Sequence, residues 1–269
     1  MDNILSVKDL KIDVISERGV VHAVRGVTFD LRQTEIHGFV GESGCGKTMT
    51  AKSILRLHDE EKSLSSGEIL YNGMDILSLK KKELREIRGS EIAMIFQDPM
   101  QSLNPLLTIG EQITEMLRFH EKLNKKDAYI KAISLLEDVG IKPAKSRFKQ
   151  YPFEFSGGML QRIMIAIAIS CDPKILIADE PTTALDVTIQ AQILQLLKKL
   201  NKEKGMTIYI ITHNFGVVAE ICDRVSVMYA GKIVETGDVG QIFKNPCCES
   251  LTSIYLLHYN ITYKTIISF

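Results

Sequence analysis

The sequence lacks an excess of charge of either sign. Its 269 residues include 33 lysines and arginines and 33 aspartates and glutamates, so the formal net charge is zero. A protein whose main role is to bind nucleic acid through a basic surface carries a clear positive excess. We therefore expect no nucleic-acid partner. The hydrophobic content of 45% is ordinary for a folded globular chain.

Cysteine patterns, leader peptides and long apolar runs are also missing. The chain has no disulfide-like or zinc-like cysteine spacing, which indicates a reducing compartment. Met1 is not followed by basic residues and a long apolar core, so no signal peptide is expected. The most apolar stretch, residues 163–171, is far shorter than the ~20 residues of a membrane span. These absences predict a soluble, cytosolic chain. The five cysteines are Cys45, Cys171, Cys222, Cys247 and Cys248.

One stretch that is present matches the phosphate-binding pattern G-x-x-x-x-G-K-[ST]. An apolar run at residues 36–40 predicts a buried strand before it, and helical spacing at 49–57 follows it. In this setting backbone N–H groups and the helix dipole converge on a phosphate. We expect Lys47 to reach the β- and γ-phosphates, Thr48 to bind Mg²⁺, and alkylation of Cys45 to block nucleotide binding. The stretch consists of Gly41, Glu42, Ser43, Gly44, Cys45, Gly46, Lys47 and Thr48.

Hydrophobic periodicity predicts the secondary structure around this loop. Gly19 and Gly26 are expected as turns, and Asn72-Gly73 as a hairpin turn. The apolar runs after residue 170 flank a helix, which predicts a parallel, buried sheet. The pattern thus predicts an α/β core with a helical insert. Strands are predicted at 5–12, 20–24, 27–31, 68–71, 92–96, 174–179 and 207–212, and helices at 108–119, 125–139, 156–170 and 189–200.

An acidic pair ends the apolar run at residues 174–179. Strands of open α/β sheets deliver such side chains to the edge where ligands bind. We expect Asp179 to join the Mg²⁺ shell and Glu180 to orient or deprotonate the water that attacks the γ-phosphorus. An isolated acid at a strand end is often only structural. The phosphate loop upstream favours the functional interpretation.

A serine–glycine–glycine segment at residues 156–158 lies upstream of the acidic strand. A serine can cap a helix start, and two glycines let that helix end approach an anion closely. With Gln97 before it and Asp179 after it, the segment resembles the signature of the ATP-binding subunits of ABC transporters. A lone histidine at a strand end is more often a surface residue, but in this series His213 is similar to the switch histidine of that family. Ala184-Leu185-Asp186 likewise resembles its D-loop.

The resemblance covers about residues 3–245 and implies a P-loop NTPase fold with an N-terminal antiparallel β subdomain. It implies one ATP-binding domain at 1–245, a helical subdomain inserted at about 106–170, and a short extension at 246–269. ATP and Mg²⁺ are the implied cofactors. The implied catalytic residues are Glu180, His213, Gln97 and Lys47. The implied metal-binding residues are Thr48, Gln97 and Asp179. Ser156, Gly157, Gly158, Met159 and Asp186 are implied to meet a nucleotide across a two-chain interface.

The match is closest to one branch, the importers of dipeptides, oligopeptides and nickel, on residues 96–105, 156–162 and 178–188. Peptide uptake is the expected function, and nickel uptake is the alternative. The implied partners are a homologous but non-identical ATPase chain, two transmembrane permease subunits and an extracytoplasmic substrate-binding protein. The chain itself is then a peripheral protein on the cytoplasmic side of the cell membrane.

Four positions depart from the family pattern. Val14 stands where an aromatic residue often stacks on adenine, with His22 as a substitute. Met159 replaces the usual signature glutamine, as is common in this branch. Cys247 and Cys248 begin the segment Cys247-Cys248-Glu249-Ser250, which stands where this branch usually has His-Pro-Tyr-Thr, and an adjacent cysteine pair is too small for a four-ligand cluster.

Two other classes of function remain as alternatives. ABC ATPases that act on DNA or ribosomes carry coiled-coil insertions, zinc modules or two cassettes in one chain, and this sequence shows none of these. A small-molecule kinase could share the phosphate loop but has no use for the segment at Ser156 or for Asp186. Both alternatives are therefore disfavoured.

Overall fold

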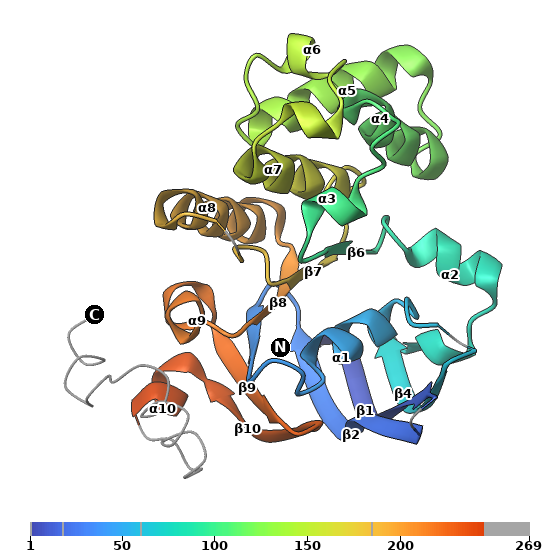
Figure 1. Ribbon diagram of the computed structural model, residues 1–269, viewed down its shortest axis with the longest axis vertical. Helices are drawn as coiled ribbons and strands as arrows, with labels where there is room; N and C mark the ends of the chain where they lie inside the picture. The colour runs from blue at the N-terminus through green and yellow to red at the C-terminus, as the bar shows by residue number, and fades with distance from the viewer. Residues whose placement is uncertain (1, 18, 60, 184, 245–269) are drawn as a thin grey trace.

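A six-stranded sheet forms the centre of the computed structural model, which describes residues 2–17, 19–59, 61–183 and 185–244 (Figure 1). Its strand order is β10-β9-β3-β8-β7-β6, and all neighbours are parallel except β10, which is antiparallel to β9. The order is non-sequential, so helices must cross over the sheet between parallel strands. The strands are β3 (Ile36–Val40), β6 (Ile92–Ile95), β7 (Ile175–Asp179), β8 (Thr207–Thr212), β9 (Arg224–Tyr229) and β10 (Lys232–Asp238).

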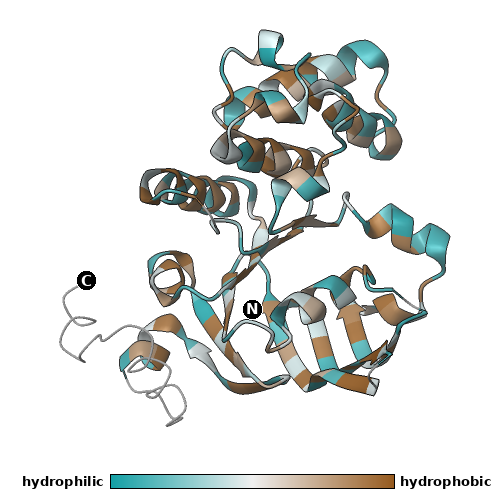
Figure 2. Cartoon of the chain, viewed as in Figure 1, coloured by the Kyte–Doolittle hydropathy of each residue, from teal (hydrophilic) through white to brown (hydrophobic). Residues whose placement is uncertain are grey.

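Alternate side chains of the central strands enter two different cores. In β7, Leu176 and Ala178 pack with the helices, whereas Ile175 and Ile177 pack with α1 (Lys47–Ile54) and the N-terminal sheet. Successive strand residues point to opposite faces, so both faces of this sheet are covered. Such a sheet needs continuous apolar strands, which explains the apolar runs in the sequence. Figure 2 shows these strands in brown between the two layers.

A second, four-stranded antiparallel sheet has the order β2-β1-β4-β5. Two strands predicted at 20–24 and 27–31 are in fact one strand, so the expected turn at Gly26 is wrong. Gly26 has φ +85° and lies where the pairing of the first two strands shifts register, which makes it a bulge. Asn72-Gly73 does join two antiparallel strands, as predicted. The strands are β1 (Asn3–Ser16), β2 (Gly19–Arg32), β4 (Ser63–Tyr71) and β5 (Met74–Asp75).

Four helices, α4 to α7, lie together at the top of Figure 1, beyond α8 and the central sheet. The predicted helices at 108–119, 125–139, 156–170 and 189–200 correspond to α4, α5, α7 and α8. Shorter helices flank the sheets. The helices are α2 (Lys81–Ile87), α3 (Pro99–Ser102), α4 (Ile109–His120), α5 (Lys125–Asp138), α6 (Ala144–Arg147), α7 (Gly157–Ala168), α8 (Val187–Lys204), α9 (Phe215–Ile221), α10 (Val239–Lys244), and the 3₁₀ turns η1 (Ile76–Ser78) and η2 (Pro152–Glu154).

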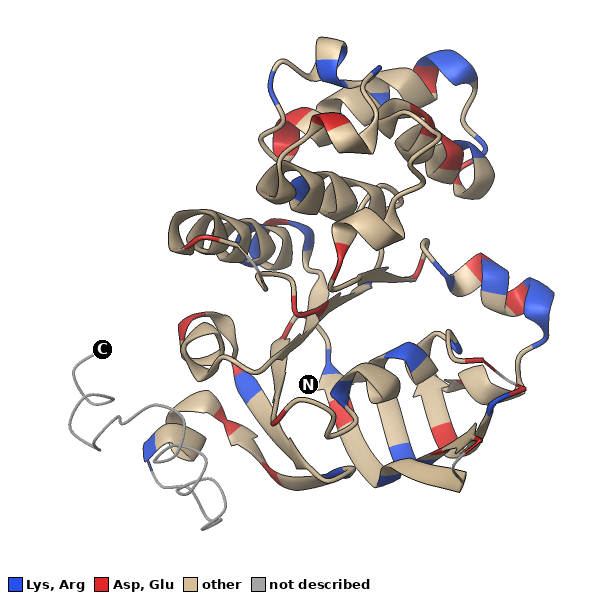
Figure 3. Ribbon diagram, viewed as in Figure 1, with Lys and Arg blue, Asp and Glu red and all other residues tan. Residues whose placement is uncertain are grey.

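The predicted α/β architecture, with an antiparallel N-terminal sheet and a helical group, is confirmed. Helices α2, α9 and α10 and strands β9 and β10 were not predicted. Charged side chains are frequent on α2 and sparse on the central strands (Figure 3). Within the part of the chain that the structure describes, no helix is both long and apolar enough to span a lipid bilayer.

Candidate active site

The glycine loop connects β3 to α1, and its glycines are required by close backbone contacts. A Cβ atom at Gly41 would lie 2.1 Å from the carbonyl oxygen of Met228, and one at Gly46 would lie 2.4 Å from that of Ala23. Both residues have positive φ, +155° and +107°. Gly44 has φ +80°, but a Cβ at this residue would meet no neighbour within 4 Å. Gly41 and Gly46 thus allow the loop to pack closely against β9 and β2, and Gly44 provides the positive φ that the turn requires.

Lys47 is the first residue of α1, and its side chain lies back over the loop. Its ammonium group donates to the carbonyl oxygens of Gly41, at 2.8 Å, and Glu42, at 2.7 Å. The Cys45 sulfur lies 3.6 Å from the same nitrogen. Lys47 is only 5% exposed. The loop therefore holds a buried cation beside its own backbone N–H groups, which is an arrangement suited to an anion.

The first acid of the strand end, Asp179, is buried at 2% exposure and touches the loop helix. The Thr48 hydroxyl donates to its Oδ1 at 3.0 Å. Burial raises the pKa of Asp179, and this outweighs the Thr48 hydrogen bond, which lowers it. A carboxylate that is costly to ionise in the protein alone gains most from a nearby cation. Its position predicts a cation partner at this place.

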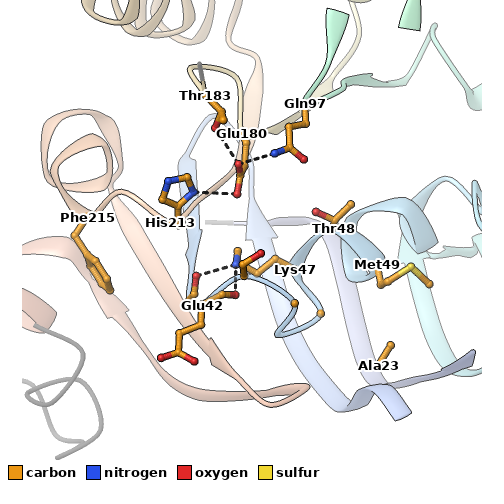
Figure 4. Close-up of a pocket in the computed structure, with 14 residues that line it drawn as sticks. Ala23, Glu42, Lys47, Thr48, Met49, Gln97, Glu180, Thr183, His213 and Phe215 are labelled. Atoms are coloured by element: carbon orange, nitrogen blue, oxygen red, sulfur yellow. Dashed lines mark hydrogen bonds and ion pairs between the residues drawn. The ribbon is translucent and has the colours of Figure 1, made fainter. Parts of the chain in front are cut away.

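The second acid, Glu180, extends from the end of β7 into the space above the loop (Figure 4). Its Oε2 accepts hydrogen bonds from Gln97 Nε2 and Thr183 Oγ1, both at 2.9 Å. Its Oε1 lies 3.1 Å from His213 Nδ1. Residues from three separate parts of the chain thus converge on one carboxylate.

The backbone of Glu180 is unusual for a non-glycine residue. Its φ is +47°, in the left-handed region, and its N–H donates to the carbonyl oxygen of Ile211 at 2.9 Å. Strained conformations of this kind persist where the surroundings fix them, and they concentrate at functional sites. Here the strain turns the side chain out of the sheet and toward His213.

These residues line one cavity of about 650 Å³. Of the residues predicted in the glycine loop and at the end of β7, Cys45 and Asp179 are not in its wall, although both contact residues that are. Four wall residues were not predicted. Thr183 could have been found as the hydroxyl residue that ends the D-E-P-T-T turn, whereas Ala23, Met49 and Phe215 carry no recognisable motif. The wall is formed by Ala23, Gly41, Glu42, Ser43, Gly44, Gly46, Lys47, Thr48, Met49, Gln97, Glu180, Thr183, His213 and Phe215.

The serine–glycine–glycine segment lies outside this cavity. Ser156 occupies the N-cap position of α7, as predicted, but its side chain makes no capping hydrogen bond. Gly158 packs against α8, where a Cβ would lie 2.8 Å from Ile189 Cγ2. Asp186 accepts from the Ile189 N–H at 2.9 Å and starts α8. Gly157 and Met159 follow on α7, and neither they nor Ser156 and Asp186 line the cavity.

Val14 and His22, the residues considered for stacking on adenine, also lie outside this cavity. His22 is 2.7 Å from Asp13 and lines a separate groove. Val14, which pairs with Val21, lines neither space. Cys247, Cys248 and Ala184 lie outside the described residues. Cys45, Cys171 and Cys222 are free thiols.

The donor atoms of Thr48, Gln97 and Asp179 suit Mg²⁺, which prefers a hydroxyl, a carboxylate and an amide oxygen over nitrogen or sulfur. Asp179 and Thr48 are already in contact, and burial raises the pKa of this carboxyl although Thr48, Lys52 and Lys47 favour its charged form. Among the described residues, no group of three or more histidine, cysteine or acidic side chains is placed so that it could hold a metal ion by itself. Mg²⁺ in nucleotide sites takes few protein ligands because phosphates and water supply the rest. The residues fit this ion.

A glycine loop between a parallel strand and a helix that begins with Lys47, next to an acidic strand end, is typical of P-loop nucleoside triphosphatases. The comparisons with known proteins identify the family within this class. A profile described as "ABC transporter" matches residues 24–183. The oligopeptide transport ATP-binding protein of Bacillus subtilis is 54% identical over 244 residues, which cover 90% of this chain and 68% of that protein. The dipeptide transport ATP-binding protein of the same organism is 51% identical over 247 residues, which cover 91% and 74%.

A solved structure is also similar. It is a dimeric, post-hydrolysis state of an ATP-binding cassette bound to ADP and Pi, with a TM-score of 0.78 and 27% identity, covering 87% of this chain and 98% of that one. The chain belongs to the ABC transporter family. It is an ATPase of that family, and the predicted family resemblance is confirmed.

Proposed function

We propose that this chain is the ATP-hydrolysing subunit of an ABC importer for peptides. The assignment of peptide as the substrate rests on the match to the oligopeptide and dipeptide transport proteins. This match covers about nine-tenths of this chain at 54% and 51% identity. The names of these relatives favour peptide over the nickel alternative. The chemistry of the motor is supported separately, by the contacts around Lys47 and Glu180.

Nucleotide binding rests on the glycine loop. On binding, the Lys47 ammonium would exchange its two backbone carbonyl partners for phosphate oxygens, and the loop N–H groups would bind the same phosphates. Thr48, Gln97 and Asp179 would hold Mg²⁺, which supplies charge neutralisation on the β- and γ-phosphates. Positioning and charge stabilisation supply most of the rate in phosphoryl transfer.

Hydrolysis depends on Glu180 and its partners. The carboxylate would orient the attacking water and accept its proton. His213, at 3.1 Å, would steady the carboxylate and reach the γ-phosphate, and Gln97 would link the carboxylate to the metal shell. These three side chains are in contact before nucleotide arrives, so the reacting groups need little rearrangement.

A second chain completes the site in this proposal. Ser156 is exposed, its hydroxyl is not used to cap α7, and it lies outside its own chain's cavity. It is therefore available to a γ-phosphate held by another subunit, together with Gly157, Gly158, Met159 and the region of Asp186. The similar solved structure is dimeric. The partner would be a homologous, non-identical chain.

The remaining partners follow from the role of an importer motor. Two transmembrane permease subunits would carry the substrate, and an extracytoplasmic binding protein would deliver it. The chain would sit at the cytoplasmic side of the cell membrane. Residues 1–245 would form the ATP-binding domain, with the helices at about 106–170 as a subdomain that moves with the permease, and 246–269 as an extension.

The substitution Glu180→Gln tests the catalytic assignment. It keeps the shape of the side chain but removes the base, so we expect unchanged ATP affinity and a loss of turnover of at least about a hundredfold. Glu137→Gln, an exposed carboxylate on α5, is the matched control and should keep full activity. ATP hydrolysis and nucleotide affinity are measured on both variants. Normal turnover by Glu180→Gln would remove Glu180 from its role.

Transport is tested by reconstitution. The chain, its permease subunits and the substrate-binding protein are placed in vesicles, and uptake of labelled peptide and of nickel is measured with and without ATP. ATP-dependent peptide uptake is expected. Uptake of nickel alone would overturn the proposed substrate and leave the ATPase assignment in place.

A further inference from the structure

Thr183 contacts the catalytic carboxylate through its side chain. Its Oγ1 donates to Glu180 Oε2 at 2.9 Å, and the residue lines the same cavity as Lys47 and His213. Figure 4 shows its side chain pointing toward Glu180 from the turn that follows β7. The hydroxyl can donate only one hydrogen bond, and the structure gives that bond to the carboxylate.

The backbone explains why this contact forms. Residues 180–183 make a turn in which the Thr183 N–H donates to the carbonyl oxygen of Glu180 at 3.2 Å. Pro181, the second residue of the turn, has the fixed φ that favours this position. The turn closes on Glu180, whose own N–H is bound to Ile211 in β8. Thr183 therefore holds both the main chain and the side chain of the same residue.

The other two partners of Glu180 come from distant segments that take part in binding. Gln97 follows β6, and His213 follows β8. Both are assigned other contacts during turnover, with the metal shell and the γ-phosphate. Thr183 alone among these three is tied to Glu180 by a local turn, so its position relative to Glu180 does not depend on a distant segment of the chain.

We propose that Thr183 is a positioning residue for hydrolysis, which fixes the rotamer of Glu180 while Gln97 and His213 also serve the metal shell and the γ-phosphate. The inference rests on the proposed role of Glu180 as the group that activates water. A hydroxyl that donates to a carboxylate orients its remaining lone pairs toward the attacking water. The role is one of geometry, and Thr183 touches no reacting atom.

Three substitutions test the proposal. Thr183→Val keeps the shape and removes the hydroxyl, Thr183→Ala gives a second variant without it, and Thr183→Ser retains it. Loss of one hydrogen bond to a charged group corresponds to a fall in kcat of about tenfold. We expect this fall for valine and alanine, with KM for ATP unchanged, and recovery to near the parent rate for serine. Thr183 is exposed, so folding should tolerate all three, and melting temperatures check this.

A double-mutant cycle separates positioning from a merely structural role. In a Glu180→Ala background the acceptor is gone, so Thr183→Val should leave the residual rate unchanged. Equal falls in both backgrounds would overturn the proposal, as would a Thr183→Val enzyme with the parent kcat. If Glu180→Ala itself retains normal turnover, the proposed function of Glu180 fails instead. The two failures are thus distinguished by the single variants.

Discussion

At the scale of single residues, Asp179 shows how the site balances charge and burial. Its carboxyl is 2% exposed, and burial raises its pKa from the ordinary 3.8, because water no longer solvates the charge. Thr48 supplies one hydrogen bond, which offsets only part of this cost. The protein without nucleotide therefore carries an electrostatic penalty that a bound cation would remove.

This penalty predicts how stability depends on pH. A carboxyl whose pKa is raised on folding favours the protonated form, so its contribution to stability is greatest in acid. That contribution falls as pH rises from about 4 through the raised value. Asp179→Asn removes the titration while it can still accept the Thr48 hydrogen bond. Without nucleotide or Mg²⁺, the melting temperature of the variant relative to the parent should rise with pH.

The measurement is thermal unfolding of both proteins from about pH 4 to about pH 8. The other titratable groups are the same in both proteins, so their effects largely cancel in the difference between the two melting temperatures. With Mg²⁺ and ATP added at neutral pH, the order should reverse, because only the parent gains the cation contact. A pH-independent difference between the two proteins would contradict the account of Asp179.

At the scale of elements, the glycine loop is held by backbone contacts that tolerate no side chain at two positions. Gly46→Ala would force a Cβ to within 2.4 Å of the Ala23 carbonyl at φ +107°. A strained residue costs on the order of 1–3 kcal/mol, which corresponds to a fall in melting temperature of roughly 2–4 °C per kcal/mol. ATP binding should weaken as well, because the loop moves.

Gly44→Ala is the matched control for this prediction. Gly44 also has positive φ, +80°, but a Cβ there has no neighbour within 4 Å. Its cost should be only that of the backbone conformation, about 1–2 kcal/mol. Thermal unfolding and nucleotide titration compare the two variants. Equal losses would mean that the contact with Ala23 does not shape the loop.

Periodicity predicted the long elements because they bury their side chains regularly. Strands β7 and β8 are apolar on both faces, and α4 and α5 follow a three- and four-residue spacing, so each could be read from the sequence. The acid pair and glycine loop were located by motif. The bulge at Gly26 was not, since a glycine with positive φ fits a turn as well as a bulge, and only the partner strand decides.

Other features depend on contacts between distant residues and leave no pattern. Strand β10 alternates exposed and half-buried residues, which resembles a loop in sequence. His37 is fully buried in β3, where it bonds to Ser226 on β9, and burial lowers its pKa. A histidine in an apolar run gives no hint of this partner. The contact of Thr183 with Glu180 is different, because it forms within one local turn and the hydroxyl residue of that turn could have been recognised in the sequence.

At the scale of the whole molecule, the residues assigned to one reaction lie in two separate places. Lys47 and Glu180 face the cavity between the loop and the end of β7, whereas Ser156 begins a helix of the upper group in Figure 1. The two places do not share a cavity in one chain. This separation supports the proposal that a second chain supplies Ser156 to the site, with the nucleotide as part of the interface between the two chains.

Dilution of the chain mixed with an equal amount of its homologous partner chain tests this central claim most directly. We predict that ATP turnover per chain falls steeply as the protein is diluted, and that Ser156→Arg abolishes turnover while ATP still binds to the glycine loop, since the substituted residue acts only across the interface. Sedimentation of the Glu180→Gln protein together with the partner chain should show an ATP-dependent dimer that Ser156→Arg weakens. A chain that hydrolyses ATP at the same rate as a monomer, with or without the Ser156 substitution, would contradict the account.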